Sequence, residues 1–115
     1  MKFVFATILL GASLAAQDQA KPPAVDPAAL RETRHHFDLA AMRAAAYIHS
    51  ADSIEANLRE DGAVLHPRIA VLRLRIEAAL NEAGAAISER DLAAAEKAID
   101  RAEALIDRFA REIGG

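Results

Sequence analysis

The sequence predicts an all-α protein, an antiparallel up-down-up three-helix bundle with a long first helix. Apolar residues recur alternately three and four positions apart over residues 92–113 and again over residues 30–58. This spacing places them on one face of a helix that packs against partner helices, as in a coiled coil. Pro27 and Pro67 mark helix starts and Gly62 marks a helix end. Because the connections are short, consecutive helices should be antiparallel.

Residues 1–15 are expected to be a signal peptide. Lys2 precedes an apolar run over residues 3–14, which is shorter than the roughly 20 residues that cross a bilayer. Small residues up to Ala15 match the pattern that signal peptidase recognises, with cleavage after Ala15 or Ala16. The protein is therefore predicted to be periplasmic or secreted, without membrane association after cleavage.

A leader over residues 16–26 is expected to be disordered. It is polar and contains Pro22-Pro23, a composition that favours an extended chain over a packed element. The helical bundle domain is then expected over residues 27–115.

The first helix is expected over residues 27–58. Asp26 suits its N-cap, where the carboxylate accepts a hydrogen bond from a free backbone N–H, and Pro27 suits its first position. Neither proline nor glycine interrupts the sequence between Pro27 and Leu58. The sequence therefore predicts one unbroken helix over these residues.

The second helix is expected over residues 67–86. His66 suits a capping position before Pro67. Val71 and Leu74 widen the apolar stripe of this helix. A broad stripe is what a middle helix with two neighbours requires.

The third helix is expected over residues 89–113. Gly84 either ends the preceding helix or loosens it, and Ser88 is predicted to be the N-cap of the third helix. Charged residues on its solvent face are spaced as ion pairs four positions apart, Asp107 with Arg111 and Arg108 with Glu112.

Composition narrows the classes of protein to consider. Cysteine is absent, which excludes disulfides, thiolate metal sites and a cysteine nucleophile. The chain is rich in alanine, which permits close helix packing but contributes little apolar area. The formal net charge of −3 becomes −4 once Lys2 leaves with the signal peptide. This sign argues against a nucleic-acid partner, which needs a cationic surface.

The sequence carries none of the common catalytic motifs. It has no glycine-rich phosphate loop, nucleophile elbow or H-E-x-x-H pattern, so we expect no enzyme and no cofactor. Several carboxylates are spaced as on a solvated helix face: Glu77, Glu82, Glu96 and Asp100. The predicted function is that of a small exported helical protein that acts through contacts with a protein partner, as a periplasmic adaptor, a chaperone-like protein or an envelope-associated factor.

A homodimer through the first helix is a further expectation. The N-terminal half of this helix is the part that the shorter helices are expected to cover least. Its small side chains let a second helix approach closely, and burial of a phenylalanine side chain contributes about 1.5–3 kcal/mol. The predicted interface comprises Leu30, Phe37, Ala40, Ala41, Ala44 and Tyr47.

Binding of a transition-metal ion is the alternative function, in a periplasmic metal-binding or metal-sensing protein. The predicted ligands lie in the first helix: His35, His36, His49 and Asp52. His35 and His36 are adjacent and point about 100° apart on a helix, so they do not chelate one ion as residues four apart do. His49 and Asp52 are three apart and can share an ion.

Overall fold

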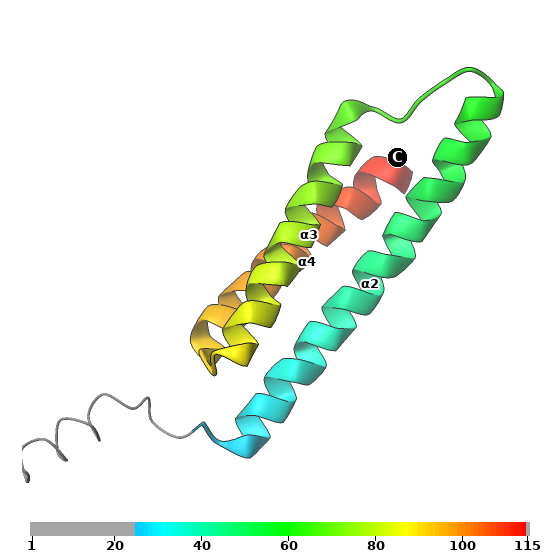
Figure 1. The fold of residues 1–115 in the computed structure, drawn as a ribbon. Helices are drawn as coiled ribbons and strands as arrows, with labels where there is room; N and C mark the ends of the chain where they lie inside the picture. The colour runs from blue at the N-terminus through cyan, green and yellow to red at the C-terminus, as the bar shows by residue number, and fades with distance from the viewer. Residues whose placement is uncertain (1–24, 115) are drawn as a thin grey trace, which may run out of the picture.

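The computed structural model describes residues 25–114, which form three α-helices packed together (Figure 1). They are α2 (Pro27–Glu60), α3 (Pro67–Ser88) and α4 (Leu92–Gly114). In Figure 1, α3 runs back beside α2 and α4 returns in the direction of α2. The prediction of an all-α protein of three packed helices with a long first helix is confirmed. The predicted signal peptide and residues 16–24 of the predicted leader lie outside the described residues.

Side chains cap the N-terminal ends of α2 and α3 as the sequence predicts. The Oδ1 atom of Asp26 accepts a hydrogen bond from the Ala28 N–H at 3.2 Å, and Pro27 begins α2. His66 caps α3, where its Nδ1 atom accepts from the Arg68 N–H at 3.1 Å. Each cap satisfies one of the backbone donors that the start of a helix leaves free. None of the three described helices is both long and apolar enough to cross a membrane.

A residue in the left-handed conformation closes the C-terminal ends of α2 and α3. After α2, Gly62 has φ of 75°, and the N–H that follows it donates to the Leu58 carbonyl at 2.8 Å. After α3, Arg90 has φ of 64°, and the following N–H donates to the Ala86 carbonyl at 2.9 Å. This is the Schellman arrangement, which satisfies the last carbonyls of each helix and turns the chain toward the next one.

The start of α4 differs from its prediction. The assignment of Ser88 as the N-cap is wrong, because Ser88 is the last residue of α3 and its Oγ donates to the Gly84 carbonyl at 3.2 Å. Asp91 takes that position: its carboxylate accepts from the Ala94 N–H at 3.1 Å, and α4 begins at the next residue. Gly84 does not end α3, which continues through it to Ser88.

The core between the helices combines many alanines with few large side chains. Nine of the sixteen buried apolar residues in the described part of the chain are alanines. The larger side chains that are almost completely buried number five: Leu72, Ile76, Ile99, Ile106 and Phe109. Small side chains allow a short distance between helix axes, and α3 and α4 share the most extensive contact of the three helix pairs.

Two glycines are expected to respond to alanine in opposite directions. Gly84 lies within α3, and a Cβ atom there would meet the Phe37 ring at 3.8 Å, an ordinary van der Waals contact. Gly84→Ala should therefore stabilise the fold by about 0.5–1 kcal/mol through its helix propensity. Gly62→Ala meets no neighbouring atom, but it places a side chain in the left-handed conformation, which costs roughly 1–2 kcal/mol.

Urea denaturation of the wild type and both variants measures these two effects. We expect a higher midpoint for Gly84→Ala and a lower one for Gly62→Ala, with unchanged slopes. A less stable Gly84→Ala protein would contradict the observed packing of the Phe37 ring over this turn of α3.

Candidate functional site

A histidine on α2 lies between two carboxylates of α4. The Nδ1 atom of His36 is 2.7 Å from Glu96 Oε2, and its Nε2 atom is 2.7 Å from Glu103 Oε1. Glu96 and Glu103 are two helical turns apart and so project from one face of α4. All three side chains are partly exposed, with accessible fractions of 32% for His36, 40% for Glu96 and 34% for Glu103.

This geometry favours the protonated imidazole. Donation from both ring nitrogens requires a proton on each, so a histidine that is bonded in this way is a cation. The hydrogen bond to Glu96, with a further one to Glu103, raises the pKa of His36 above its ordinary value, although partial burial opposes the rise. His36 therefore connects α2 to α4 by charge as well as by hydrogen bonds.

The two carboxylates belong to an acidic row on the face of α4 that meets α2. The row has four members: Glu96, Asp100, Glu103 and Asp107. Arg43 of α2 donates to Asp107 at 2.7 Å and lies 4.0 Å from Glu103. The hydrogen bond to Asp107 also raises the pKa of Arg43. Three of the four carboxylates therefore pair with one imidazole and one guanidinium, whereas Asp100 makes no ion pair with a described residue.

The acidic row differs from what spacing along α4 predicts. Glu96 is predicted on a solvated face, but it bonds to His36 across the helix interface. Asp107 is predicted to pair with Arg111, but its observed partner is Arg43. In both cases packing brings a side chain of α2 to the carboxylate, which the sequence of α4 alone does not show.

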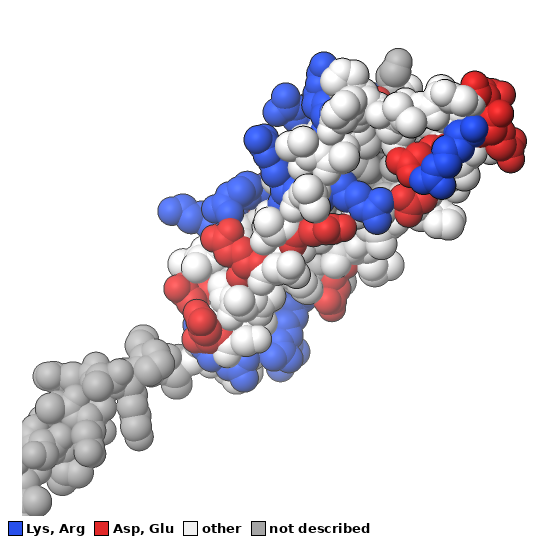
Figure 2. All heavy atoms as spheres, turned by 45° about the horizontal axis from the view of Figure 1, so that its top comes forward, with Lys and Arg blue, Asp and Glu red and all other residues white. Residues whose placement is uncertain are grey.

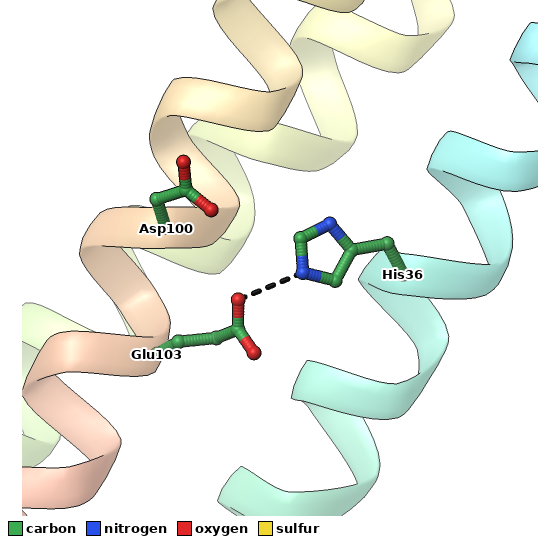
Figure 3. A group of neighbouring side chains, drawn as sticks. All are labelled: His36, Asp100 and Glu103. Atoms are coloured by element: carbon green, nitrogen blue, oxygen red, sulfur yellow. Dashed lines mark hydrogen bonds and ion pairs between the residues drawn. The ribbon is translucent and has the colours of Figure 1, made fainter.

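Three side chains in this interface converge closely. His36, Asp100 and Glu103 each offer one atom that could bind a metal ion, and these atoms lie within 4.8 Å of one another. Figure 3 shows both carboxylates on the side of α4 that faces the His36 ring. Because the carboxylates come from a different helix, spacing within the first helix does not predict them. The regular acidic row of α4 is the sequence signal that points to them.

The other predicted metal ligands lie apart from this group. His35 and His49 are exposed on α2. Asp52 accepts a hydrogen bond from Arg73 of α3 at 2.8 Å. Within residues 25–114, His36 is the one predicted ligand that belongs to a convergent group of at least three metal-ligating side chains.

The residues of the predicted dimer interface have neighbours within the chain. Ala40 and Ala44 are 1% and 2% exposed and belong to the main core. Leu30 and Phe37 pack on a small cluster where α3 ends and α4 begins. The partly buried members are Leu30, Phe37, Ala41 and Tyr47. The α3–α4 hairpin thus covers the N-terminal half of α2 more fully than predicted, and the homodimer stays a prediction.

A second candidate surface is an open groove formed by α3 and α4. It has a volume of about 360 Å³, and its lining residues are Arg75, Ala78, Ala79, Glu82, Arg101 and Leu105. The prediction that Val71 and Leu74 widen the inward stripe of α3 is wrong, because they are 45% and 66% exposed. These two side chains lie one turn before the groove residues Arg75 and Ala78 on α3 and extend its apolar surface.

Arginines outnumber acidic residues around this groove. Arg101 pairs with Glu82 at 2.6 Å, and Glu112, which is predicted to pair with Arg108, instead accepts from Arg68 at 3.3 Å. Arg75 and Arg108 make no ion pair with the residues that the structure describes. Figure 2 shows Lys and Arg side chains gathered along the edge of the bundle where α3 and α4 lie.

The described residues therefore offer two surfaces of different chemistry. One is the His36 and carboxylate group between α2 and α4, and the other is the arginine-rich apolar groove of α3 and α4. Comparison of the chain with protein-family models, curated proteins and solved structures finds no match.

Proposed function

We propose that the protein is exported and acts through contacts with another protein, and that the α3–α4 groove binds an acidic amphipathic helix of that partner. The apolar run over residues 3–14 supports export. The observation that carries the docking proposal is the combination of exposed apolar side chains that extend the groove along α3 with a lining arginine, Arg75, that lacks an ion pair in the described residues.

The apolar part of the groove suits a helix rather than an extended segment. Val71, Leu74 and Ala78 follow one another at three- and four-residue steps along α3, and Leu105 lines the opposite wall on α4. Two packed helices form a long groove between them, and a third helix can fill this groove with side chains at the same three- and four-residue spacing. α2 contacts both α3 and α4 in this way, so an added helix would repeat the packing of the bundle.

The arginines of the groove favour a partner of negative charge. Arg75 stands among its lining residues, and Arg108 lies two turns after Arg101 on α4. Both guanidinium groups are free to pair with carboxylates at the edge of a docked helix, where arginine binds carboxylates in a bidentate manner. An acidic partner therefore complements the groove, whereas a basic one is repelled.

Binding of two designed peptides tests this function. The first is an amphipathic helix with leucines on one face and glutamates on the other, and the second carries lysines in place of the glutamates. We expect the wild type to prefer the acidic peptide. Arg75→Glu replaces attraction by repulsion, each worth about 0.2–1 kcal/mol at an exposed site, so it should weaken that binding roughly two- to thirtyfold.

Arg34→Glu is the matched control, because Arg34 is an exposed arginine of α2 outside the groove. It should leave the affinity for the acidic peptide nearly unchanged. Equal binding of both peptides, or equal weakening by the two variants, would contradict the proposed groove. Vesicles of anionic lipid form a third arm, and binding to them in preference to the acidic peptide would replace the protein partner by a membrane surface.

A further inference from the structure

We infer that His36, Asp100 and Glu103 form a binding site for one divalent transition-metal ion, which joins α2 to α4. This site differs from the one predicted from the first helix alone, since two of its ligands come from α4. It also lies at a different helix interface from the docking groove. The two proposals can therefore fail independently.

The three ligand atoms need little movement to enclose an ion. They all lie within 4.8 Å of one another, and ligands at about 2.0–2.1 Å from a tetrahedral zinc ion lie roughly 3.3 Å apart. Asp100 is exposed and Glu103 is partly exposed, so both carboxylates can rotate toward the imidazole without disturbing the core. The helix backbones already bring them to the same side of the His36 ring (Figure 3).

Glu96 supplies the second feature of a metal site. It bonds to the Nδ1 atom of His36 at 2.7 Å, while the Nε2 atom points toward Glu103. A histidine that binds a metal through one ring nitrogen commonly donates from the other nitrogen to a carboxylate, which orients the ring and strengthens its bond to the metal. This arrangement is present here before any ion is added.

The charge of the site also favours a cation. Asp100 makes no ion pair with a described residue, while Arg43 donates to Asp107, farther along the acidic row, and lies 4.0 Å from Glu103. A divalent ion that replaces the imidazole proton on Nε2 would balance two carboxylates at once. Asp100 is exposed, and the His36 and Glu103 side chains are 32% and 34% accessible, so the ion and its water ligands can reach the site directly from solvent.

The donor set indicates which ions bind. One imidazole nitrogen with two carboxylate oxygens suits Zn²⁺ and other borderline divalent ions of the first transition series, whereas a soft ion such as Cu⁺ prefers the thiolates that this chain lacks. Three protein ligands leave the remaining positions of the ion to water. The site would therefore be open to solvent on one side.

Calorimetric titration of the protein, without a histidine tag, with Zn²⁺ tests the site. We expect one ion per chain with a dissociation constant in the micromolar range. Asp100→Asn keeps the size of the side chain but removes a ligand, and it should weaken binding roughly tenfold or more. Because the ion joins two helices, Zn²⁺ at about a hundredfold excess over its dissociation constant should also raise the melting temperature of the wild type by on the order of 10 °C.

Asp107→Asn is the matched control, because it removes the same charge from the same row without removing a ligand. It should change the affinity for Zn²⁺ by less than roughly threefold, as expected for a screened charge at the surface. Equal weakening by both variants would show general attraction of cations to the row and overturn the site. A dissociation constant above about 1 mM for the wild type would also overturn the site. Glu103→Gln removes a second ligand and must reproduce the effect of Asp100→Asn.

Discussion

Replacement of Phe109 by alanine should lower the free energy of unfolding by about 3–5 kcal/mol. Phe109 is completely buried and is one of five large side chains buried in an alanine-rich core. Its removal loses the transfer free energy of the ring and leaves a cavity that neighbouring alanines cannot fill. Since small domains are stable by only about 5–15 kcal/mol in total, this variant should lose much of its stability.

Thermal and urea denaturation of Phe109→Ala measure this loss, and Leu74→Ala provides the control. Leu74 is 66% exposed, so its truncation should change the stability by less than about 0.5 kcal/mol. For a domain of this size, each kcal/mol corresponds to about 4–8 °C in melting temperature. Similar melting temperatures for the two variants would show that Phe109 does not occupy the core as observed.

Replacement of Ala98 by leucine should cause the second largest loss in the free energy of unfolding. Ala98 has no exposed surface and belongs to the main core, in the helix pair with the most extensive contact. Ala98→Leu must either push α3 and α4 apart or force side chains out of their preferred rotamers. Overpacking of this kind costs about 1–3 kcal/mol and sometimes more.

Ala104→Leu makes the same chemical change at an exposed position of the same helix. It should change stability by less than about 0.5 kcal/mol, since leucine and alanine have similar helix propensities and no neighbour is displaced. Urea midpoints of the two variants and the wild type decide the comparison. If Ala98→Leu is as stable as Ala104→Leu, then α3 and α4 are not in the close contact described here.

Local sequence signals predicted most of the helical architecture. The apolar spacing identified all three helices, and Asp26, Pro27 and His66 identified where two of them begin. These signals are sufficient because a cap or a turn depends on residues within a few positions of each other. The one N-cap that was wrong, Ser88, lies in a connection of three residues, where a shift of one turn changes which side chain can reach the free N–H groups.

Exposure on the helices was predicted less well. Val71 and Leu74 extend the apolar stripe of α3 in the sequence, but the structure leaves both exposed. Phe37 belongs to the predicted dimer surface, but its ring packs over Gly84. A helix buries only the part of its apolar surface that its neighbours reach, and the positions of those neighbours are not encoded in its own periodicity.

The sequence by itself determined the class of fold, the order and approximate bounds of its helices, and the absence of cysteine chemistry. Only the tertiary structure decided that His36 meets Glu96 and Glu103, and that arginines of α3 and α4 border one apolar groove. The physical reason is the range of the interactions. Helix propensity and capping act over a few residues, whereas a site between helices depends on packing that joins positions about sixty residues apart, such as His36 and Glu96.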